Sequence, residues 1–414
     1  MRLLECPIRN YAWGSRTSLA ELRGVPTPAP HPEAELWMGA HPADPAWVVS
    51  DGDRVSLIEA IGADPGATLG KRVASEHGEK LPFLLKVLAA EEPLSLQAHP
   101  SLQQAKEGFA RENRAGIALG AAHRNYKDDN HKPELVVALT PFKALAGFRD
   151  PVRTAKLLTE LAGPAMKPYC DMLAEQPDSA GLRALFTTWI TLPQQPLRTL
   201  LDDLTDGCVR HLKGAKNGPF RREAQMLLEL AEHYPGDAGV LTASLLNYAE
   251  LAPGEGLYVT AGSLHAYLHG MGVEVMATSD NVLRGGMTPK HVDVAELLRV
   301  LDFSPSDALP VSVHNASPGG TAEYIYDTPA PEFRLSRIEL DATGLHHSVS
   351  LGLIDPGPQI LVCTRGGVTA RCGSEEIDVP QGGALWVPAQ DPEVILHAHT
   401  ARTQVFRALV PAVG

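Results

Sequence analysis

The first 150 positions of the chain alternate short apolar runs with turn residues. Apolar runs at 46–49, 81–88 and 135–139 are typical of buried strands, and the strict alternation of apolar and polar residues at 94–99 is typical of a half-buried strand. We expect a helix over 101–119. These patterns predict a region that is rich in β structure.

A helical pattern replaces the strand pattern between residues 151 and 248. Leucines recur there three and four positions apart, which places each group on one face of a helix, and proline and glycine separate the groups. A further short helix is expected over 291–300. Strand patterns return after the helical segment, at 257–259, 273–275, 359–363 and 384–387.

This order predicts a mainly β protein with a helical insertion. A chain of 414 residues is too long for one ordinary core, so two or three domains are expected. We assign residues 1–150 and 249–308 to two parts of one β domain, residues 151–248 to a helical domain, and residues 309–414 to a C-terminal β domain.

Composition narrows the class of protein. Hydrophobic residues make up 44% and charged residues 21% of the chain, which is typical of a folded protein. The 36 basic and 49 acidic residues give a net charge of -13, which would repel a phosphate backbone, so no nucleic-acid partner is expected. No apolar run is long enough for a membrane helix, so no membrane partner is expected either. Five scattered cysteines and the lack of a secretory signal indicate a cytoplasmic location.

Two short motifs in the first β region offer metal ligands. Gln97 and His99 are two positions apart and would share one face of a strand, although a polar surface strand is the simpler interpretation. Glu134 ends the motif HKPE at 131–134 and offers a carboxylate as a further ligand. The simpler interpretation of that motif is an ion pair between Lys132 and a neighbouring acid.

Two more candidates follow the helical segment. His265 and His269 come after a glycine turn, and either is a metal ligand or a hydrogen-bonded core residue. Four charged residues then interrupt an apolar stretch with glycines on both sides, which indicates an anion site. They are Glu274, Asp280, Arg284 and Lys290. The pairs at 346–347 and 397 with 399 lack nearby carboxylates in a similar pattern, and no motif for a nucleotide or for a serine triad occurs.

Taken together, these motifs resemble those of type I mannose-6-phosphate isomerases. The resemblance runs in order along nearly the whole chain, through segments 10–15, 35–39, 81–100, 125–148 and 261–289. Its most specific parts are LSLQAHP at 94–100, HKPE at 131–134 and ATSDNVLR at 277–284. The chain departs from the family where Ser263 and Leu264 replace a proline before His265, and in the less polar segment 269–272. These departures concern the local shape of the loops.

The resemblance implies a fold and a set of site residues. It implies a cupin-like, jelly-roll catalytic domain with an inserted all-α domain, and a second, C-terminal cupin-like domain. It implies one zinc ion per chain, with ligands Gln97, His99, Glu134 and His265. The family's catalytic arginine matches Arg284, and the other matching pocket positions are Lys132, Glu274, Asp280, Lys86, Ser95 and Lys290.

The resemblance also implies the reaction, which is the reversible isomerisation of mannose 6-phosphate to fructose 6-phosphate through a cis-enediol. Glu274, Asp280, a lysine or a zinc-bound hydroxide could each be the general base, and Lys290 is the first candidate for holding the phosphate. Two other classes fit parts of the ligand set, namely a cupin oxygenase with Fe(II) and a sugar-binding cupin without turnover. The basic residues near the ligands favour an anionic sugar phosphate and the isomerase. We expect a monomer or a weak homodimer.

Overall fold

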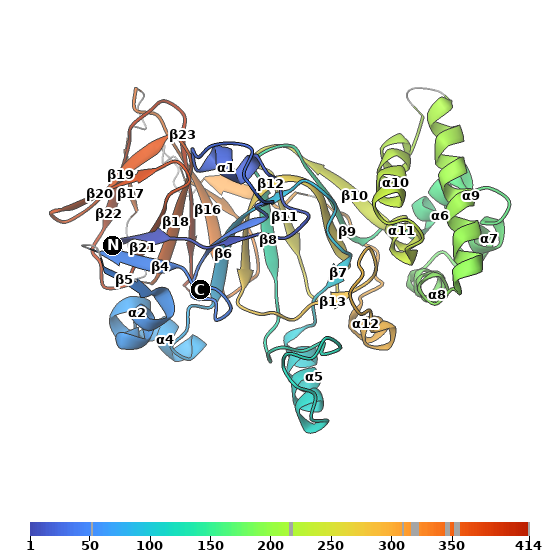
Figure 1. The fold of residues 1–414 in the computed structure, drawn as a ribbon, viewed down its shortest axis with the longest axis horizontal. Helices are drawn as coiled ribbons and strands as arrows, with labels where there is room; N and C mark the ends of the chain where they lie inside the picture. The colour runs from blue at the N-terminus through green and yellow to red at the C-terminus, as the bar shows by residue number, and fades with distance from the viewer. Residues whose placement is uncertain are drawn as a thin grey trace.

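The computed structural model describes residues 1–50, 53–214, 218–308, 310–315, 323–343, 348–351 and 357–412. Its described part is built from two large β sheets, one small sheet and a group of helices at one end (Figure 1). The helices at that end lie far from the small sheet, which is at the opposite end of the molecule. No described helix is long and apolar enough to cross a membrane.

The first sheet has ten strands and carries the candidate site residues. Its main path runs β10 (Leu246–Leu251), β9 (Phe142–Phe148), β12 (His265–Ala277), β6 (Phe83–Ala90), β3 (Glu35–Met38) and β2 (Ile8–Arg9). Four further strands pair beside this path, namely β7 (Gln97–Ala98), β8 (Glu134–Ala138), β11 (Gly256–Val259) and β13 (Leu283–Arg284).

Strand β12 joins the two halves of this sheet. Its first residues pair with β9 and β7, and its later residues pair with β6 and β8, with a register shift between Tyr267 and His269. Gly270 follows the shift with φ of 119°, and a Cβ there would lie 2.6 Å from the backbone oxygen of Pro141. Glycine is therefore required at the bend. This bend lies in the segment whose sequence departs from the family pattern.

The second sheet has nine strands and combines both ends of the chain. Its order is β14 (Val313–Asn315), β15 (Glu323–Tyr326), β16 (Arg334–Leu340), β23 (Thr403–Leu409), β18 (Gln359–Arg365), β21 (Ala384–Val387), β1 (Arg2–Glu5), β4 (Trp47–Ser50) and β5 (Asp53–Ser56). The small sheet consists of β17 (Ser348–Leu351), β22 (Val394–Ala398), β19 (Gly367–Cys372) and β20 (Glu375–Pro380). Strands from segment 1–150 thus pair with strands from segment 309–414.

Alternation along the strands separates a core face from a site face in the first sheet. Leu85, Val87, Val273 and Val275 point to one face, where they join a buried cluster with second-sheet residues such as Phe406. The residues between them, including Lys86 and Glu274, point to the other face. The second sheet therefore covers the apolar face of the first sheet and leaves the polar face to the site.

The helical segment expected from the leucine pattern is confirmed up to Ala243, whereas its expected last residues, 246–248, belong to β10. Helices α6 (Pro151–Leu161), α7 (Lys167–Glu175), α8 (Ser179–Ile190), α9 (Gln194–Lys213), α10 (Arg221–His233) and α11 (Ala238–Ala243) follow one another in the chain and form the group at one end of Figure 1. Their buried leucines surround Phe186 and Trp189, and the cluster continues through Phe148 into the first sheet. The remaining helices are α1 (Ser18–Leu22), α2 (Leu57–Ala63), α3 (Pro65–Leu69), α4 (Lys71–His77), α5 (Leu102–Arg114) and α12 (Val294–Val300).

Two expectations about element length were wrong. Only Gln97 and Ala98 of the alternating stretch 94–99 form a strand, because Leu94 and Leu96 hydrogen bond to isolated backbone oxygens of Tyr267 and Gly286 and continue no ladder. The helix expected over 101–119 ends at Arg114, since Gly116 turns the chain with φ of 72°.

The contact between α6 and α9 depends on the absence of a side chain at Gly207. A Cβ at Gly207 would lie 1.5 Å from the backbone oxygen of Leu161, so Gly207→Ala must separate the two helices. We expect it to lower the free energy of unfolding by about 1–3 kcal/mol, measured by urea denaturation. Gly62→Ala is the control, because Gly62 lies in α2 with no atom near its added Cβ, and it should be neutral or slightly stabilising. Equal effects of the two variants would contradict this account.

Candidate active site

Three buried side chains from separate strands meet at one point of the first sheet. His99 follows β7, Glu134 begins β8 and His265 begins β12. Nε2 of His99 lies 3.3 Å from one carboxylate oxygen of Glu134, and Nε2 of His265 lies 3.5 Å from the other. One ligand atom of each residue lies within 4.8 Å of the others, and no other such group of three His, Cys, Asp or Glu occurs among the described residues. This arrangement has the donor set of a site for a zinc-like ion.

The two imidazole rings are already oriented for a metal. Nδ1 of His99 donates to the backbone oxygen of Asn281 over 2.8 Å, and Nδ1 of His265 donates to that of Ser263 over 3.1 Å. The Nε2 lone pairs are therefore directed toward Glu134. Nε2 of His99 is buried and has no hydrogen-bond partner, which is costly unless an ion fills the space. The residues present thus fit a divalent metal.

The protonation states also suit a metal. Burial lowers the pKa of His99 to about 4, so the ring is neutral at pH 7. Burial alone would raise the pKa of Glu134, but the nearby Lys132 and His99 outweigh it and hold that pKa well below its usual value. Nζ of Lys132 lies 2.8 Å from the Glu134 carboxylate. Neutral histidines and an ionised carboxylate are the forms in which these residues bind metal.

Asn281 connects His99 to the loop that carries Lys132 and Glu134. Its fully buried side chain accepts hydrogen bonds from the backbone N–H groups of Lys127 and Asp128. The same side chain donates to the backbone oxygens of Asp128 and Asn130. One asparagine therefore fixes both the ring of His99 and the approach to Glu134.

Residues that lie opposite one another on β7, β12 and β13 place Arg284 beside the metal-site residues. In the strand register, Gln97 of β7 lies opposite both His265 of β12 and Arg284 of β13. Residues opposite each other in antiparallel strands share a face, so Gln97 lies between a ligand and the arginine. The amide of Gln97 is 3.4 Å from the hydroxyl of Ser95. Burial lowers the pKa of Arg284, which nevertheless stays charged at neutral pH.

A further set of residues that lie opposite one another crosses strands β3, β6 and β12. Trp37, Lys86 and Glu274 are opposite one another in register, and Nζ of Lys86 lies 3.5 Å from the Glu274 carboxylate. Burial raises the pKa of Glu274 to about 7, although Lys86 opposes this. Glu35 also contacts Lys86, at 3.4 Å. A carboxyl group that titrates near neutral pH beside a metal site is suited to proton transfer.

The last two predicted residues are more exposed. The side chain of Asp280 is 55% exposed and lies 3.4 Å from Nε2 of His41, which lowers the pKa of Asp280. Lys290 is exposed, and burial and then the charge of Arg284 lower its pKa. Arg284 and Lys290 thus form a positive region beside the ligands.

One candidate residue lies apart from the site, and four neighbours of the site were missed. His269 is exposed beyond the bend in β12, so the interpretation of His269 as a ligand is wrong. The residues 346–347 lie outside the described part of the chain. Glu35, Trp37, His41 and Asn281 were not singled out, although three of these four lie in segments that carry the family resemblance.

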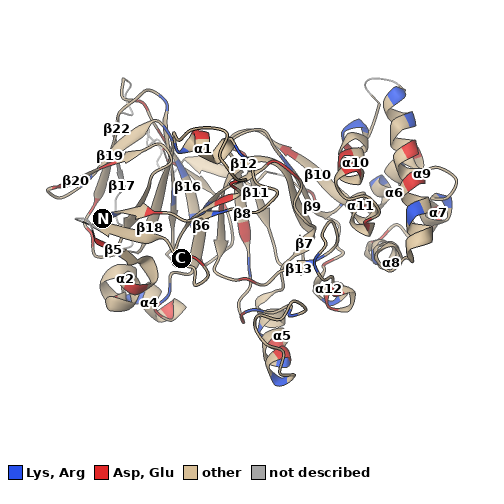
Figure 2. Cartoon of the chain, in the orientation of Figure 1, with Lys and Arg blue, Asp and Glu red and all other residues tan. Residues whose placement is uncertain are grey.

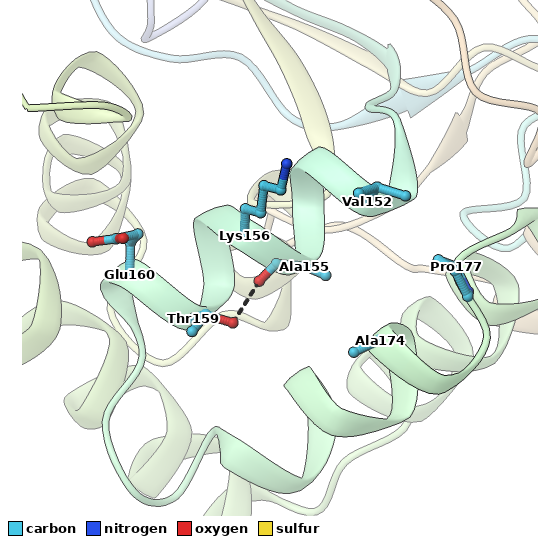
Figure 3. A pocket seen from close by; sticks show the side chains of 7 residues that line it. All are labelled: Val152, Ala155, Lys156, Thr159, Glu160, Ala174 and Pro177. Carbon is cyan, nitrogen blue, oxygen red and sulfur yellow. Dashed lines mark hydrogen bonds between the residues drawn. The ribbon is translucent and has the colours of Figure 1, made fainter.

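Two other surface features lie away from the ligands. A hollow of about 360 Å³ between α6 and α7 is lined mainly by short or apolar side chains, with Lys156 and Glu160 at its edge (Figure 3). None of the predicted site residues lines it. Basic and acidic residues are intermingled on the described helices of the helical segment (Figure 2).

The fold and the site define a metal-dependent enzyme built on β sheets, and comparisons with known proteins identify its family. Residues 1–151 match the family model of the phosphomannose isomerase type I catalytic domain. The chain is 38% identical to the mannose-6-phosphate isomerase of Escherichia coli K12 over 410 residues, covering 99% of this chain and 100% of that protein. It is 30% identical to the human mannose-6-phosphate isomerase, covering 98% of this chain and 97% of that protein.

Solved structures agree with these relatives. A variant of phosphomannose isomerase from Salmonella typhimurium has a TM-score of 0.88 at 35% identity, with both chains fully covered. A mannose 6-phosphate isomerase described as holo and zinc bound has a TM-score of 0.87 at 36% identity, covering 99% of each chain. The chain belongs to the type I phosphomannose isomerases, which confirms the resemblance seen in the sequence.

The support of the 127–130 loop by the side chain of Asn281 can be tested through metal affinity. Asn281→Ala removes the amide that fixes the 127–130 loop, so we expect zinc to bind about 10- to 100-fold more weakly, measured by competition with a chromophoric chelator. Asn10→Ala is the control, because the exposed side chain of Asn10 donates only to Pro32. Unchanged affinity in a folded Asn281→Ala protein would refute this supporting role.

Proposed function

We propose that the chain interconverts mannose 6-phosphate and fructose 6-phosphate with one zinc ion, held by Gln97, His99, Glu134 and His265. The observation that carries the proposal is the preformed cluster of two neutral imidazoles and one carboxylate, with the unpaired Nε2 of His99 facing Glu134. Membership of the isomerase family and a zinc-bound relative support the same reaction and metal. The oxygenase and the silent sugar-binding protein have no comparable support.

The reaction moves one proton between C1 and C2 and shifts the carbonyl group. From mannose 6-phosphate, a base takes the C2 proton, electrons move toward the C1 oxygen, and a cis-enediol forms. The proton then returns to C1, while a hydroxyl proton passes from O2 to O1. Zinc, when bound, supplies a Lewis acid that polarises the carbonyl oxygen.

We propose Glu274 as the base. Its carboxyl group is buried on the site face, and its pKa near 7 lets it both accept and return a proton at neutral pH. Asp280 is a weaker candidate because it is half exposed and its pKa is lowered by His41. Asp280 would instead orient the sugar hydroxyls, and Lys132 would orient the ionised ligand Glu134.

The positive residues supply charge stabilisation and substrate binding. Arg284, opposite Gln97 in register, stabilises negative charge on the enediolate oxygens. Lys290 holds the phosphate group, since it is exposed and close enough to Arg284 for the two charges to interact. Ser95 and Lys86 complete the substrate-binding set.

We also propose the finer division of the fold. The first sheet forms a cupin-like, jelly-roll catalytic domain from segments 1–150 and 249–308, with the all-α domain 151–248 inserted between them. Segment 309–414 forms a second cupin-like domain, to which β1, β4 and β5 contribute strands.

The cellular location and the partners of the protein are inferred from its charge and cysteine content. All five cysteines are free, which suits the reducing cytoplasm, and the net charge of -13 disfavours nucleic acid. We propose a cytoplasmic monomer or weak homodimer whose partner is the sugar phosphate, without nucleic acid or membrane.

A coupled assay of fructose 6-phosphate formation tests reaction and metal together. Chelation should abolish turnover and zinc should restore it, while His99→Ala should lose the metal. Arg284→Ala should retain zinc but lower kcat about 10²- to 10³-fold, because charge on the enediolate is no longer stabilised. Arg299→Ala on the surface of α12 is the control and should change neither value. No turnover by the folded, zinc-loaded protein would overturn the proposal.

The pH dependence of kcat/KM tests Glu274 as the base. Below pH 7 its carboxyl group holds a proton and cannot accept another, so kcat/KM should fall about tenfold per pH unit toward acid. Zinc content is measured at each pH, so that a loss of metal is distinguished from protonation of the base. A flat profile between pH 6 and 8 would exclude Glu274 as the base.

A further inference from the structure

One ammonium group and two carboxylates share a buried space on the site face. Lys86 is 6% exposed, Glu35 is 8% exposed and Glu274 is 3% exposed. Nζ of Lys86 lies 3.4 Å from Oε1 of Glu35 and 3.5 Å from Oε2 of Glu274. Two carboxylates thus compete for one cation in a space with little water.

Glu35 makes a second contact besides the one with Lys86. Its second oxygen, Oε2, accepts a hydrogen bond from Nε1 of Trp37 over 2.8 Å. The indole ring of Trp37 in turn lies 5.1 Å from Nζ of Lys86, within range of a cation–π contact. Glu35, Trp37 and Lys86 therefore fix one another from two neighbouring strands, β3 and β6.

The surroundings of Lys86 and Glu274 in this space change their affinities for a proton. Burial alone would lower the pKa of Lys86, but Glu35 first and Glu274 second outweigh it and raise that pKa above its usual value. Glu134 also lies near enough to Glu274 to disfavour the ionised form of Glu274. The charge of Lys132 favours that ionised form. Burial is the first cause of the high proton affinity of Glu274, and the charge of Lys86, which it shares with Glu35, offsets this only in part.

We propose that Glu35 is a positioning residue that acts as the counterion of Lys86 and thereby leaves the carboxyl group of Glu274 free to exchange a proton with the sugar. This role rests on the proposed function, because it assigns Glu35 to the base of that same reaction. Without the charge of Glu35, Lys86 pairs with Glu274 alone. The pair then holds Glu274 ionised and directed toward the lysine, which makes it a weaker and misdirected base.

The test is a double-mutant cycle between Glu35→Gln and Glu274→Gln. The glutamine keeps the size of Glu35 and an oxygen for Trp37, but it removes the charge. We expect E35Q to lower kcat about 10- to 100-fold with little change in KM or zinc content. In the E274Q background, E35Q should cause no further loss, because the base it serves is already absent. Glu35→Asp, which keeps the charge, should recover part of kcat.

Controls separate this role from a loss of folding. Glu33→Gln removes a nearby carboxylate that pairs with Arg23, away from Lys86, and should leave kcat unchanged. Thermal unfolding of each variant shows whether it is folded, and if E35Q does not fold, Glu35→Asp carries the same cycle with a smaller expected loss. A crystal structure of E35Q should show Nζ of Lys86 displaced toward Glu274, whereas Glu35→Asp, which keeps the charge, should show a smaller displacement.

Two results would overturn the proposal. An equal loss of kcat from E35Q with and without Glu274 would mean that Glu35 acts independently of the base. An unchanged kcat in the folded variant would mean that Lys86 needs no second counterion. A wild-type protein without turnover would refute the proposed function, whereas the position of Lys86 in the variant crystal structure would still decide the role of Glu35.

Discussion

Buried charge must be balanced by opposite charge, and this constraint organises the site face of the first sheet. Lys86 is balanced by Glu35 and Glu274, and Lys132 is balanced by Glu134. None of these side chains can turn to the opposite face, because that face is packed against the second sheet. The alternation of β6 and β12 therefore fixes which residues meet, and the charge balance fixes their protonation states.

The second sheet also reaches the site through one contact. His131, three residues before the ligand Glu134, lies 2.5 Å from the carboxylate of Glu332. Glu332 lies between β15 and β16 and is buried. The loop with Lys132 is thus held on one side by Asn281 and on the other side by a residue of the loop between two strands of the second sheet. The ligand loop is consequently restrained by parts of the chain that are distant in sequence.

Sequence patterns predicted the elements well and the site in part. The helical segment and most buried strands follow from local periodicity, because leucine spacing and apolar runs are local properties. The predicted ligands and Arg284 rest on motif resemblance, since spacing alone left Gln97 and His99 as a polar strand; the structure brings His99, Glu134 and His265 together. Glu35, Trp37 and Asn281 were missed because their roles depend on strand register and on contacts between distant segments. His269 was misjudged because nothing local indicates the bend at Gly270.

The position of β1 in the second sheet has a consequence for how the protein is made. Arg2–Glu5 pairs with Ala384–Val387 on one side and with Trp47–Ser50 on the other. During synthesis on the ribosome, the partner β4 is available early, whereas the other edge of β1 stays unpaired until residues 384–387 of β21 have emerged. Such an open edge is a template for wrong pairing between nascent chains. Assembly of the second sheet around β1 is therefore completed late in synthesis.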